Sequence, residues 1–498
     1  MNALDSSSDS SDAPSATLQA QHTVEKIGGT SMSDYQATRA NIYLNPALKG
    51  AFYQRIFVVS AYGGITNQLL EHKKNAQPGV YALFANAEEP GSWQEAFAEL
   101  RQTMADINAS FFQDESERIE ANEFINARLD DAEQVLADLQ RLCQHGHFCL
   151  NDHLQTVREM LASLGEIHSA YNTAKLLRID GVAACFVDLS GWSGDKHYSI
   201  DEQITRAFSD IDLSCELPIT TGYCHSEDGL MATYDRGYSE ITFSRVAVLT
   251  GAREAIIHKE FHLSTADPRL VGEDNAIPIG RTNYDVADQL ANLGMEAIHP
   301  NAAKGLRQKN ILLRMKNTFE PEHGGTTITT GYVSDKPCVE IIAGRKGIYA
   351  LELFDQDMVG NMLEYGQEFL RLIARFKAHV VNKDLNANTI TYYLASNMKT
   401  IQCIQDELKK RYTSSETLVT KVCVVSAIGS HMKVPGILAQ TTQALADMNI
   451  SILAMHQSMR QVDMQFILDE SDYDAAVKSL HKQLVEVHDH GRAICLPH

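Results

Sequence analysis

The sequence lacks the features that mark several other classes of protein. No run of apolar residues approaches the ~20 that a membrane-spanning helix needs, and the N-terminal residues contain no apolar core of a secretory signal. Basic residues are few, because 43 Lys and Arg stand against 64 Asp and Glu and give a formal net charge of −21. Nucleic acids and anionic membranes attract basic surfaces. We therefore expect a cytoplasmic protein with no nucleic-acid partner and no membrane partner.

Cysteines that could form a disulfide framework are also lacking. The nine cysteines are odd in number and scattered, as is typical of reduced cytosolic thiols. The densest cluster, Cys143–Cys149, holds two cysteines and two histidines, and such side chains can bind zinc. Its spacing fits no Cys-x2-Cys or His-x3-His pattern, so a connection between two helices is the favoured interpretation. We predict no metal site there.

The sequence contains no P-loop for phosphate, since G-x-x-x-x-G-K-[ST] occurs nowhere in the chain. A different glycine-rich segment, Val24–Met32, begins with strand-like residues and continues with two glycines and two hydroxyls. Glycine lets the backbone approach a ligand and offers bare N–H groups, and a lysine adds a point charge. These groups suit a phosphate, although an ordinary turn is the alternative. The candidate residues are Lys26, Gly28, Gly29, Thr30 and Ser31.

Alternating strand and helix patterns predict a large α/β domain over residues 22–335. A buried-strand pattern at Arg55–Ser60 ends in a second loop of glycines and hydroxyls, which contains Thr66. Ligands gather at the carboxyl ends of strands in open α/β sheets, so two such loops strengthen the phosphate interpretation. We expect three layers, αβα, around a mainly parallel sheet. Residues 1–21 are rich in Ser, Asp and Ala with little to bury, and we expect a disordered tail.

Three further segments of this domain carry residues that could bind a ligand. Residues 90–178 are predicted to be mostly helical, and Glu166 within them could face a ligand amine, with a solvated glutamate as the alternative. The segment Arg236–Glu240 opens a helix with arginine, glycine and serine, a combination that favours an anion. Its acid would lie in the first turn, where it also suits the helix dipole. The segment Ser264–Arg269 is a loop with both charge signs.

The C-terminal part repeats one pattern twice. Strand, helix, two strands and helix occur at 345–415 and again at 418–490, an internal repeat of about 75 residues and of ferredoxin-like type. Small α/β units of this kind bury their sheet faces against one another, so we expect a regulatory half that forms a homodimer or a higher homo-oligomer. The last residues, 491–498, could add one more strand to a repeat.

In order along the chain, these segments resemble the motifs of aspartokinases, members of the amino-acid kinase superfamily with two C-terminal ACT modules. The matches are Lys26–Ser31 to K-F-G-G-T-S, Ser60–Asn67 to S-A-x-x-G-x-T-N, Gly165–Glu166 to an L-G-E segment, Arg236–Glu240 to R-G-G-S-D, Ser264–Arg269 to Y-T-x-D-P-R and His299–Pro300 to H-P. The residues around the lysine resemble most the divergent aspartokinases found with ectoine biosynthesis genes. An acidic chain suits the salt-stressed cytoplasm in which such genes act.

The resemblance implies an aspartate kinase, which transfers the γ-phosphoryl group of ATP to the β-carboxylate of L-aspartate. The product, 4-phospho-L-aspartate, leads towards lysine, threonine and methionine, and in this subgroup towards ectoine. Catalysis would rest on positioning and electrostatics, with Mg-ATP as the phosphoryl donor. By motif position, the implied catalytic residues are Lys26 and Glu240, and the implied aspartate-binding residues are Ser60, Thr66, Glu166, Arg236 and Ser239. The implied ATP-binding residues are Lys26, Gly28, Gly29, Thr30, Ser31, Lys259, Ser264, Asp267 and Arg269.

Three departures from the family pattern affect these roles. The usual Asp that orients the lysine is Glu240, which is one methylene longer. The second glycine of R-G-G-S is Tyr238, which could close the pocket. His258 and Lys259 stand where many members have T-D, and Ser264 replaces the usual Tyr. Of all the family's contacts, those to the base and ribose of the nucleotide are therefore the least transferable to this chain.

Two alternatives remain open at this point. One is another kinase of the superfamily, such as a glutamate kinase, acting on a different small carboxylate. The other is a pseudo-kinase that senses an amino acid through its ACT modules. For regulation, the resemblance implies lysine or threonine as an effector at a module interface, with candidate turns at 382–384 and 457–459.

Overall fold

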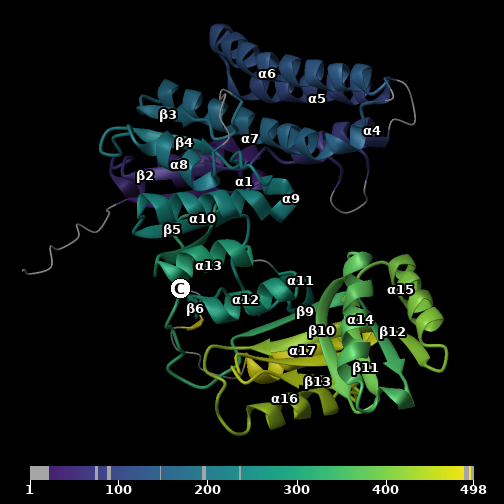
Figure 1. Ribbon diagram of the computed structural model, residues 1–498. Coiled ribbons are helices and arrows are strands. Elements are labelled where there is room, and N and C mark those ends of the chain that lie inside the picture. Colours follow the sequence, from purple (N-terminus) through teal and green to yellow (C-terminus); the bar gives the residue numbers. More distant parts are fainter. Residues whose placement is uncertain are drawn as a thin grey trace, which may run out of the picture.

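The computed structural model describes residues 22–72, 77–86, 91–145, 147–192, 198–234, 237–295, 297–486 and 493–494. The predicted tail at 1–21 and the candidate Arg236 lie outside these residues. The described chain forms two halves, each built on its own sheet, with the N-terminal half at the top of Figure 1 and the C-terminal half below it.

The N-terminal half contains an eight-stranded sheet in the order β3-β4-β2-β1-β5-β7-β8-β6. Its strands are β1 (Thr23–Ile27), β2 (Arg55–Val59), β3 (Ala184–Val187), β4 (Leu217–Thr221), β5 (Glu254–Lys259), β6 (Arg281–Asn283), β7 (Leu312–Asn317) and β8 (Thr326–Thr329). Neighbouring strands are parallel except for β7 and β8. The predicted mainly parallel α/β sheet is therefore confirmed. Every residue of β1, β2 and β4 is buried, as expected where helices cover both faces of a parallel sheet.

Short helices follow the strands and longer ones cover the sheet. They are α1 (Gly29–Ser33), α2 (Tyr35–Thr38), α3 (Ile65–Leu69), α4 (Val80–Asn86), α5 (Ser92–Phe111), α6 (Glu115–Leu142), α7 (Leu154–Ile179), α8 (Ile200–Phe208), α9 (Leu230–Tyr234), α10 (Tyr238–Thr250), α11 (Pro268–Val271), α12 (Tyr284–Asn292) and α13 (Pro300–Gln308). Helix α7 packs against β3 and β4, and α10 packs against β1 and β2. These two helices carry the acidic candidates of the site.

Helices α5 and α6 pack on each other and on α7 and form the outermost layer of this half (Figure 1). Apolar residues of α6 recur every three or four positions and give one buried stripe: Ala121, Ile125, Leu129, Ala132 and Leu136. The predicted helical region is confirmed, and the described residues of the Cys143–Cys149 cluster, 143–145 and 147–149, lie between α6 and α7, as the predicted connection requires. Over the described ranges, no group of His, Cys, Asp or Glu is arranged to hold a metal ion, and no helix is long and apolar enough to span a membrane.

The C-terminal half contains one six-stranded sheet in the order β10-β11-β9-β12-β14-β13, with antiparallel neighbours. Its strands are β9 (Ile341–Phe354), β10 (His379–Asn386), β11 (Thr389–Ala395), β12 (Glu416–Ile428), β13 (Ala454–Gln457) and β14 (Asp463–Asp469). Its helices are α14 (Met362–Arg375), α15 (Met398–Arg411), α16 (Ile437–Ala446) and α17 (Tyr473–Leu484). The two predicted repeats are present, and they join edge to edge within one chain through β9 and β12.

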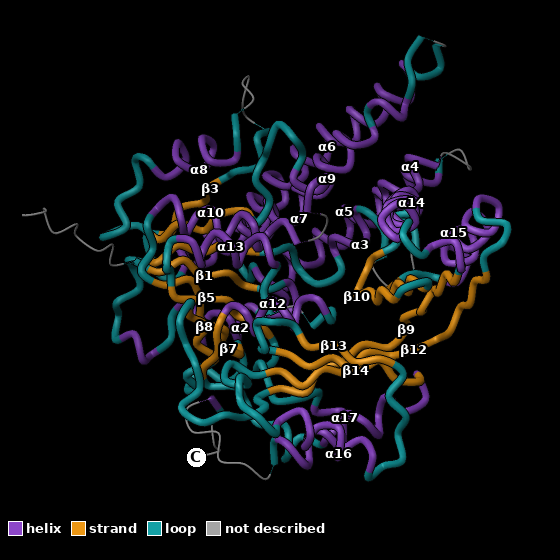
Figure 2. Tube along the Cα trace, turned by 60° about the horizontal axis from the view of Figure 1, so that its bottom comes forward, coloured by secondary structure: helices purple, strands orange, loops and turns teal. Residues whose placement is uncertain are grey.

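The helices of the two repeats lie on opposite faces of this sheet (Figure 2). Alternate residues of a strand point to opposite faces. Accordingly, Leu351 and Leu353 of β9 belong to the core beneath α14 and α15, whereas Ile348 belongs to the core beneath α16 and α17. Each face of the shared sheet is therefore covered by the helices of one repeat.

The two halves share a hydrophobic core at their junction. Ala266, Ile279 and Val286 of the N-terminal half cluster with residues of β12, β14 and α17. The C-terminal segment reaches the same junction, because Ile494 pairs with Ile279 and the N–H of Gly280 donates to the carbonyl of Ala493. The expectation that the last residues extend one of the repeats is wrong at this point, since the described pair completes the edge of the first half near β6.

Candidate active site

The glycine-rich segment after β1 forms one wall of a cleft of about 420 Å³. Its lining includes Lys26, the predicted residues Gly28 to Ser31, Glu240 and Lys259. Glycine is required at position 29, because a Cβ there would lie 2.7 Å from the carbonyl oxygen of Ala61 in the second loop. The two loops that the sequence singled out lie at the carboxyl ends of β1 and β2, as predicted, and the structure brings them into contact.

Glu240 joins the two lysines of this cleft. Its Oε1 lies 3.6 Å from Nζ of Lys26 and 3.9 Å from Nζ of Lys259, and its Oε2 accepts the backbone N–H of His299 at 2.5 Å. Burial raises the pKa of this carboxyl, but the two ammonium groups outweigh burial and hold the pKa below its ordinary value. Glu240 is therefore ionised at neutral pH. The longer side chain that replaces the family's usual Asp still reaches Lys26.

Glu166 lies on the buried side of α7 and faces α10. Its Oε1 accepts the hydroxyl of Tyr238 at 2.8 Å, and its Oε2 has no hydrogen-bond partner among the residues that the structure describes. Burial raises its pKa to about 8, although the Tyr238 hydroxyl, the backbone N–H groups of Glu166 and Ala61 and the charge of Lys26 favour the charged form. The solvated-glutamate alternative is wrong, because only 2% of this residue is exposed.

Two of the other substrate-binding candidates, Ser60 and Ser239, lie near Glu166. Ser60 directly follows β2. Its carbonyl accepts a hydrogen bond from the hydroxyl of Ser169, which lies one turn after Glu166 in α7. Thr66 is the second residue of α3 and has a half-buried side chain. Ser239 is buried in the first turn of α10, and a Cβ on Gly222 would lie 2.9 Å from its Cβ and 3.3 Å from Cγ of Glu166. Gly222, directly after β4, thus leaves the space in which Ser239 of α10 and Glu166 of α7 approach each other.

The loop after β5 only partly reaches the cleft. Residues 260–263 line it, and Phe261 is 75% exposed there. Asp267 caps α11 and forms an ion pair with Arg269 at 2.6 Å, and the Ser264 hydroxyl points to the carbonyl of His262. None of Ser264, Asp267 and Arg269 is among the residues that line this cleft. Their nucleotide role stays a prediction.

Several lining residues were not among the candidates. Phe261, His262, Met295, Ala297 and Met315 complete the cleft. A signal for part of this set was present, because residues 260–263 directly follow β5, the parallel neighbour of β1, and so emerge at the same edge of the sheet. Met295 and Met315 do not directly follow a predicted strand, so no similar sequence pattern pointed to them.

His258 lies on the opposite side of β5 from Lys259. It hydrogen-bonds Glu25 at 2.7 Å, and Arg55 binds both carboxylate oxygens of Glu25 at 2.7 and 3.0 Å. Although burial raises it, the pKa of Glu25 is held far below its ordinary value by Arg55 and His258. These three side chains tie β1, β2 and β5 together on the face of the sheet away from Lys26, so His258 replaces a family residue without entering the cleft.

Comparison with known proteins agrees with this geometry. The model of the amino acid kinase family matches residues 21–317, and that of the ACT domain matches residues 425–484. The aspartate kinase Ask_Ect of Stutzerimonas stutzeri is 55% identical over 473 residues, which cover 95% of this chain and 99% of the relative. The crystal structure of E. coli aspartokinase III in complex with aspartate and ADP has a TM-score of 0.67 at 21% identity, covering 93% of this chain and 100% of that chain. The lysine and aspartate complex of the same enzyme has a TM-score of 0.71 at 20% identity, covering 93% and 99%.

The parallel sheet with its glycine-rich cleft and the family match define a member of the amino acid kinase family. Within that family the chain belongs to the aspartate kinases, because its identity to Ask_Ect extends over nearly the whole of both chains.

Proposed function

We propose that this aspartate kinase transfers the γ-phosphoryl group of ATP to the β-carboxylate of L-aspartate and so forms 4-phospho-L-aspartate. The observation that carries the proposal is the arrangement of Lys26, Glu240 and Lys259 at the glycine-rich cleft, with Glu166 nearby. The product would lead towards lysine, threonine and methionine. The identity to Ask_Ect supports the ectoine-associated subgroup and a role in forming ectoine.

At the phosphate end, positive charge and backbone donors would stabilise the transferring group. Both reactants are anionic, so the site must hold two negative groups in line while charge spreads over the phosphoryl oxygens. Lys26 would bind the moving phosphoryl group, Lys259 the ATP phosphates, and Glu240 would hold both ammonium groups in place. The N–H group of Gly29 and the hydroxyls of Thr30 and Ser31 would complete the cradle, and Gly28 would let the backbone approach the phosphates while its own N–H donates to the carbonyl of His258.

The residues of this cleft fit Mg-ATP through its phosphates. The lining offers two ammonium groups, and Glu240 is already engaged by both and by a backbone N–H. A magnesium ion would therefore be held by phosphate oxygens and water, with little direct help from the protein. When bound, it neutralises phosphate charge. Ser264, Asp267 and Arg269 are proposed to contact the nucleotide from the loop after β5.

At the amino-acid end, Glu166 would accept the α-ammonium group and Arg236 would clamp the α-carboxylate with its two-pronged guanidinium. Ser60, Thr66 and Ser239 would line the same pocket. The burial of Glu166 beside Lys26 supports this assignment, because a buried carboxylate beside the phosphoryl-binding lysine suits a small cationic group on the substrate.

We extend the proposal to the organisation of the chain. Residues 22–335 would form the catalytic domain, and 345–415 and 418–490 two ACT modules that bind lysine or threonine and pair in a cytoplasmic homodimer or higher oligomer. The shared sheet of the two repeats and the free thiols of the described cysteines support this organisation. Activity measured with lysine, threonine and both together would identify the effector.

A hydroxamate assay that depends on ATP and L-aspartate tests the reaction. Acyl phosphate formation with aspartate supports the proposal. Turnover with glutamate alone would instead indicate another kinase of the superfamily, and no turnover with any carboxylate would indicate an amino-acid sensor.

A further inference from the structure

Tyr238 and Glu166 form a buried hydrogen bond between the start of α10 and the middle of α7. The tyrosine hydroxyl donates to Oε1 at 2.8 Å, and both residues are at most 3% exposed. Tyr238 stands where the resembled R-G-G-S-D motif has glycine, and glycine has no side chain that could donate such a bond. The contact therefore belongs to this chain and not to the motif.

The second oxygen of the same carboxylate is left for another donor. Oε2 of Glu166 is buried and, within the described ranges, has no hydrogen-bond partner. A buried carboxylate oxygen without a donor costs free energy, so an arrangement of this kind is expected where a ligand supplies the donor. Lys26 of the cleft lies near enough to favour the charged form of this carboxyl.

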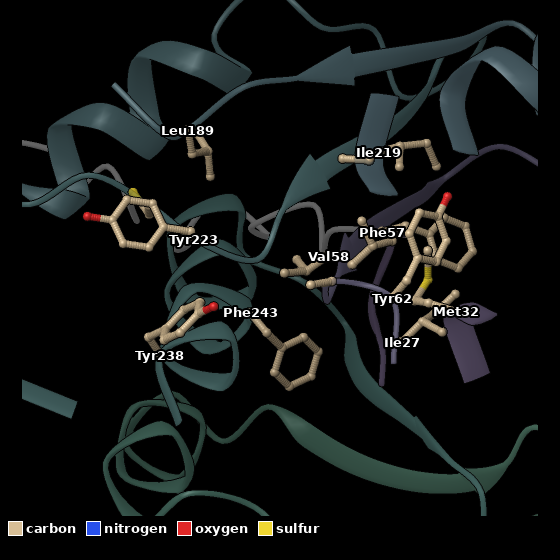
Figure 3. Packing of buried hydrophobic residues seen from close by; sticks show 14 of the residues in the cluster. Ile27, Met32, Phe57, Val58, Tyr62, Leu189, Ile219, Tyr223, Tyr238 and Phe243 are labelled. Atoms are coloured by element: carbon tan, nitrogen blue, oxygen red, sulfur yellow. The ribbon is translucent and has the colours of Figure 1, made fainter. Parts of the chain in front are cut away.

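Tyr238 is itself held in place by a second chain of contacts. Its ring packs edge to face on Tyr223 with centroids 5.7 Å apart (Figure 3). The Tyr223 hydroxyl donates to Oε2 of Glu159 at 2.9 Å, and the same glutamate accepts the backbone N–H groups of Met231 and Ala232 at the start of α9. Packing on Tyr223, which Glu159 holds by a hydrogen bond, thus fixes the ring of Tyr238.

We propose that Tyr238 is a positioning residue that fixes the Glu166 carboxylate, so that Oε2 is presented to the α-ammonium group of the amino-acid substrate. The inference rests on the proposed function, which supplies a substrate with an ammonium group. A carboxylate anchored at one oxygen loses its rotational freedom before the substrate binds, and this preorganisation strengthens binding. The pocket would thereby select an α-amino dicarboxylate over the same dicarboxylate without the amine.

The test compares two ligands that differ only in the amine. L-Aspartate and succinate carry the same two carboxylates, and succinate lacks the ammonium group. Tyr238→Phe keeps the ring and its packing on Tyr223 but removes the donor. We expect the dissociation constant of aspartate, measured by calorimetry, to rise about tenfold to a hundredfold, as for a lost hydrogen bond to a charged group. The inhibition constant of succinate and the KM of ATP should stay unchanged.

A matched control is Tyr284→Phe, which removes the hydroxyl of another buried tyrosine, one that donates to the carbonyl of Ile311 in the same half. Its aspartate and succinate affinities should equal those of the wild type. An equal loss of affinity for both ligands in Tyr238→Phe would show a merely structural role, and no loss for either would also overturn the inference.

A second variant keeps the inference testable if Tyr238→Phe folds poorly. Glu166→Gln should lower the affinity for aspartate and leave the affinity for succinate unchanged. Adding Tyr238→Phe to this variant should lower the affinity for aspartate no further, because the tyrosine acts through the glutamate. Additive losses would contradict the inference. These are binding measurements, so they are separate from turnover: an enzyme that binds aspartate but forms no acyl phosphate would contradict the proposed function and leave the role of Tyr238 supported.

Discussion

The carboxylate of Glu240 lies 3.6 Å from the ammonium group of Lys26 and so links the first turn of α10 to the end of β1. The two residues are 214 positions apart, the difference between 240 and 26, and meet because α10 packs on β1. The carboxylate also draws Lys259 towards the cleft. An ion pair at this depth orients the lysine rather than neutralising it, because one acid faces two ammonium groups.

Removing the charge of Glu240 should slow the chemical step. In Glu240→Gln the two ammonium groups repel each other and Lys26 loses its fixed position, so we expect kcat to fall about tenfold to a hundredfold. The KM of aspartate should change little, because Glu166 is untouched. Glu240→Asp is the matched variant, since it keeps the charge and restores the family's usual residue, and it should lose less activity. Steady-state kinetics with both substrates measures these changes. An equal loss of kcat in Glu240→Gln and Glu240→Asp would argue against an orienting charge.

The affinity for aspartate should depend on pH through Glu166. Its pKa of about 8 in the free enzyme means that the carboxyl is mostly protonated at neutral pH, whereas the ammonium of aspartate binds the charged form. Binding therefore releases a proton, and affinity should increase as pH rises. The groups that face this carboxyl in the described chain are Tyr238, Tyr223 and Lys26.

We expect the KM of aspartate to fall about tenfold or more between about pH 6.5 and pH 8.5 and to level off above that. Glu166→Gln should abolish this dependence while lowering affinity throughout. A KM that is flat over the same range in the wild type would remove the glutamate from the amino-acid site.

Arg236→Ala should mainly raise the KM of aspartate. The residue lies outside the described part of the chain, so the prediction rests on its position in the motif. Loss of a two-pronged contact to the α-carboxylate predicts a rise of about tenfold to a hundredfold with a smaller change in kcat. Arg236→Lys keeps the charge but not the fork, and it should recover only part of the loss. An unchanged KM in the alanine variant would exclude this arginine from the substrate site.

Glu25→Gln should destabilise the fold without entering the reaction. It leaves the buried Arg55 without its charged partner, which lowers the free energy of unfolding by about 3–5 kcal/mol. In the wild type the pKa of Glu25 is depressed. The ionised carboxylate therefore stabilises the fold fully when the pH is above the ordinary pKa of a glutamate, and this stabilisation is lost as the pH falls below that pKa. Urea unfolding at neutral and acidic pH measures both effects. Glu407→Gln, which breaks the pair with the largely exposed Lys410, should cost less than about 1 kcal/mol.

Much of the fold could be predicted because it depends on local patterns. Buried parallel strands appear as continuous apolar runs, such as Arg55–Val59, and the long helices show a three-and-four spacing. The glycine-rich loops follow the ends of such strands, so their meeting at one edge of the sheet also follows from the sequence. The resemblance to the aspartokinase motifs then implies the pairing of Lys26 with Glu240.

What could not be predicted depends on long-range packing. Whether His258 or Lys259 faces the cleft is decided by the register of β5 against β1, and a shift of one residue would exchange them. The edge-to-edge joining of β9 and β12 depends on exposed strand edges that carry no sequence signal of their own. The bond between Tyr238 and Glu166 joins residues 72 positions apart on two helices, and the space left by Gly222 beside Ser239 and Glu166 carries no sequence signal for it.

The most direct test of the central claim is the ATP- and aspartate-dependent hydroxamate assay applied to the wild type and to Lys26→Ala, with Lys409→Ala on the exposed side of α15 as a control. The wild type and the control should form aspartyl hydroxamate at equal rates. Lys26→Ala should lose at least about a hundredfold in kcat while its KM for aspartate stays within about threefold, because the lysine stabilises the moving phosphoryl group and not the amino acid. Near-normal turnover in Lys26→Ala would contradict the account.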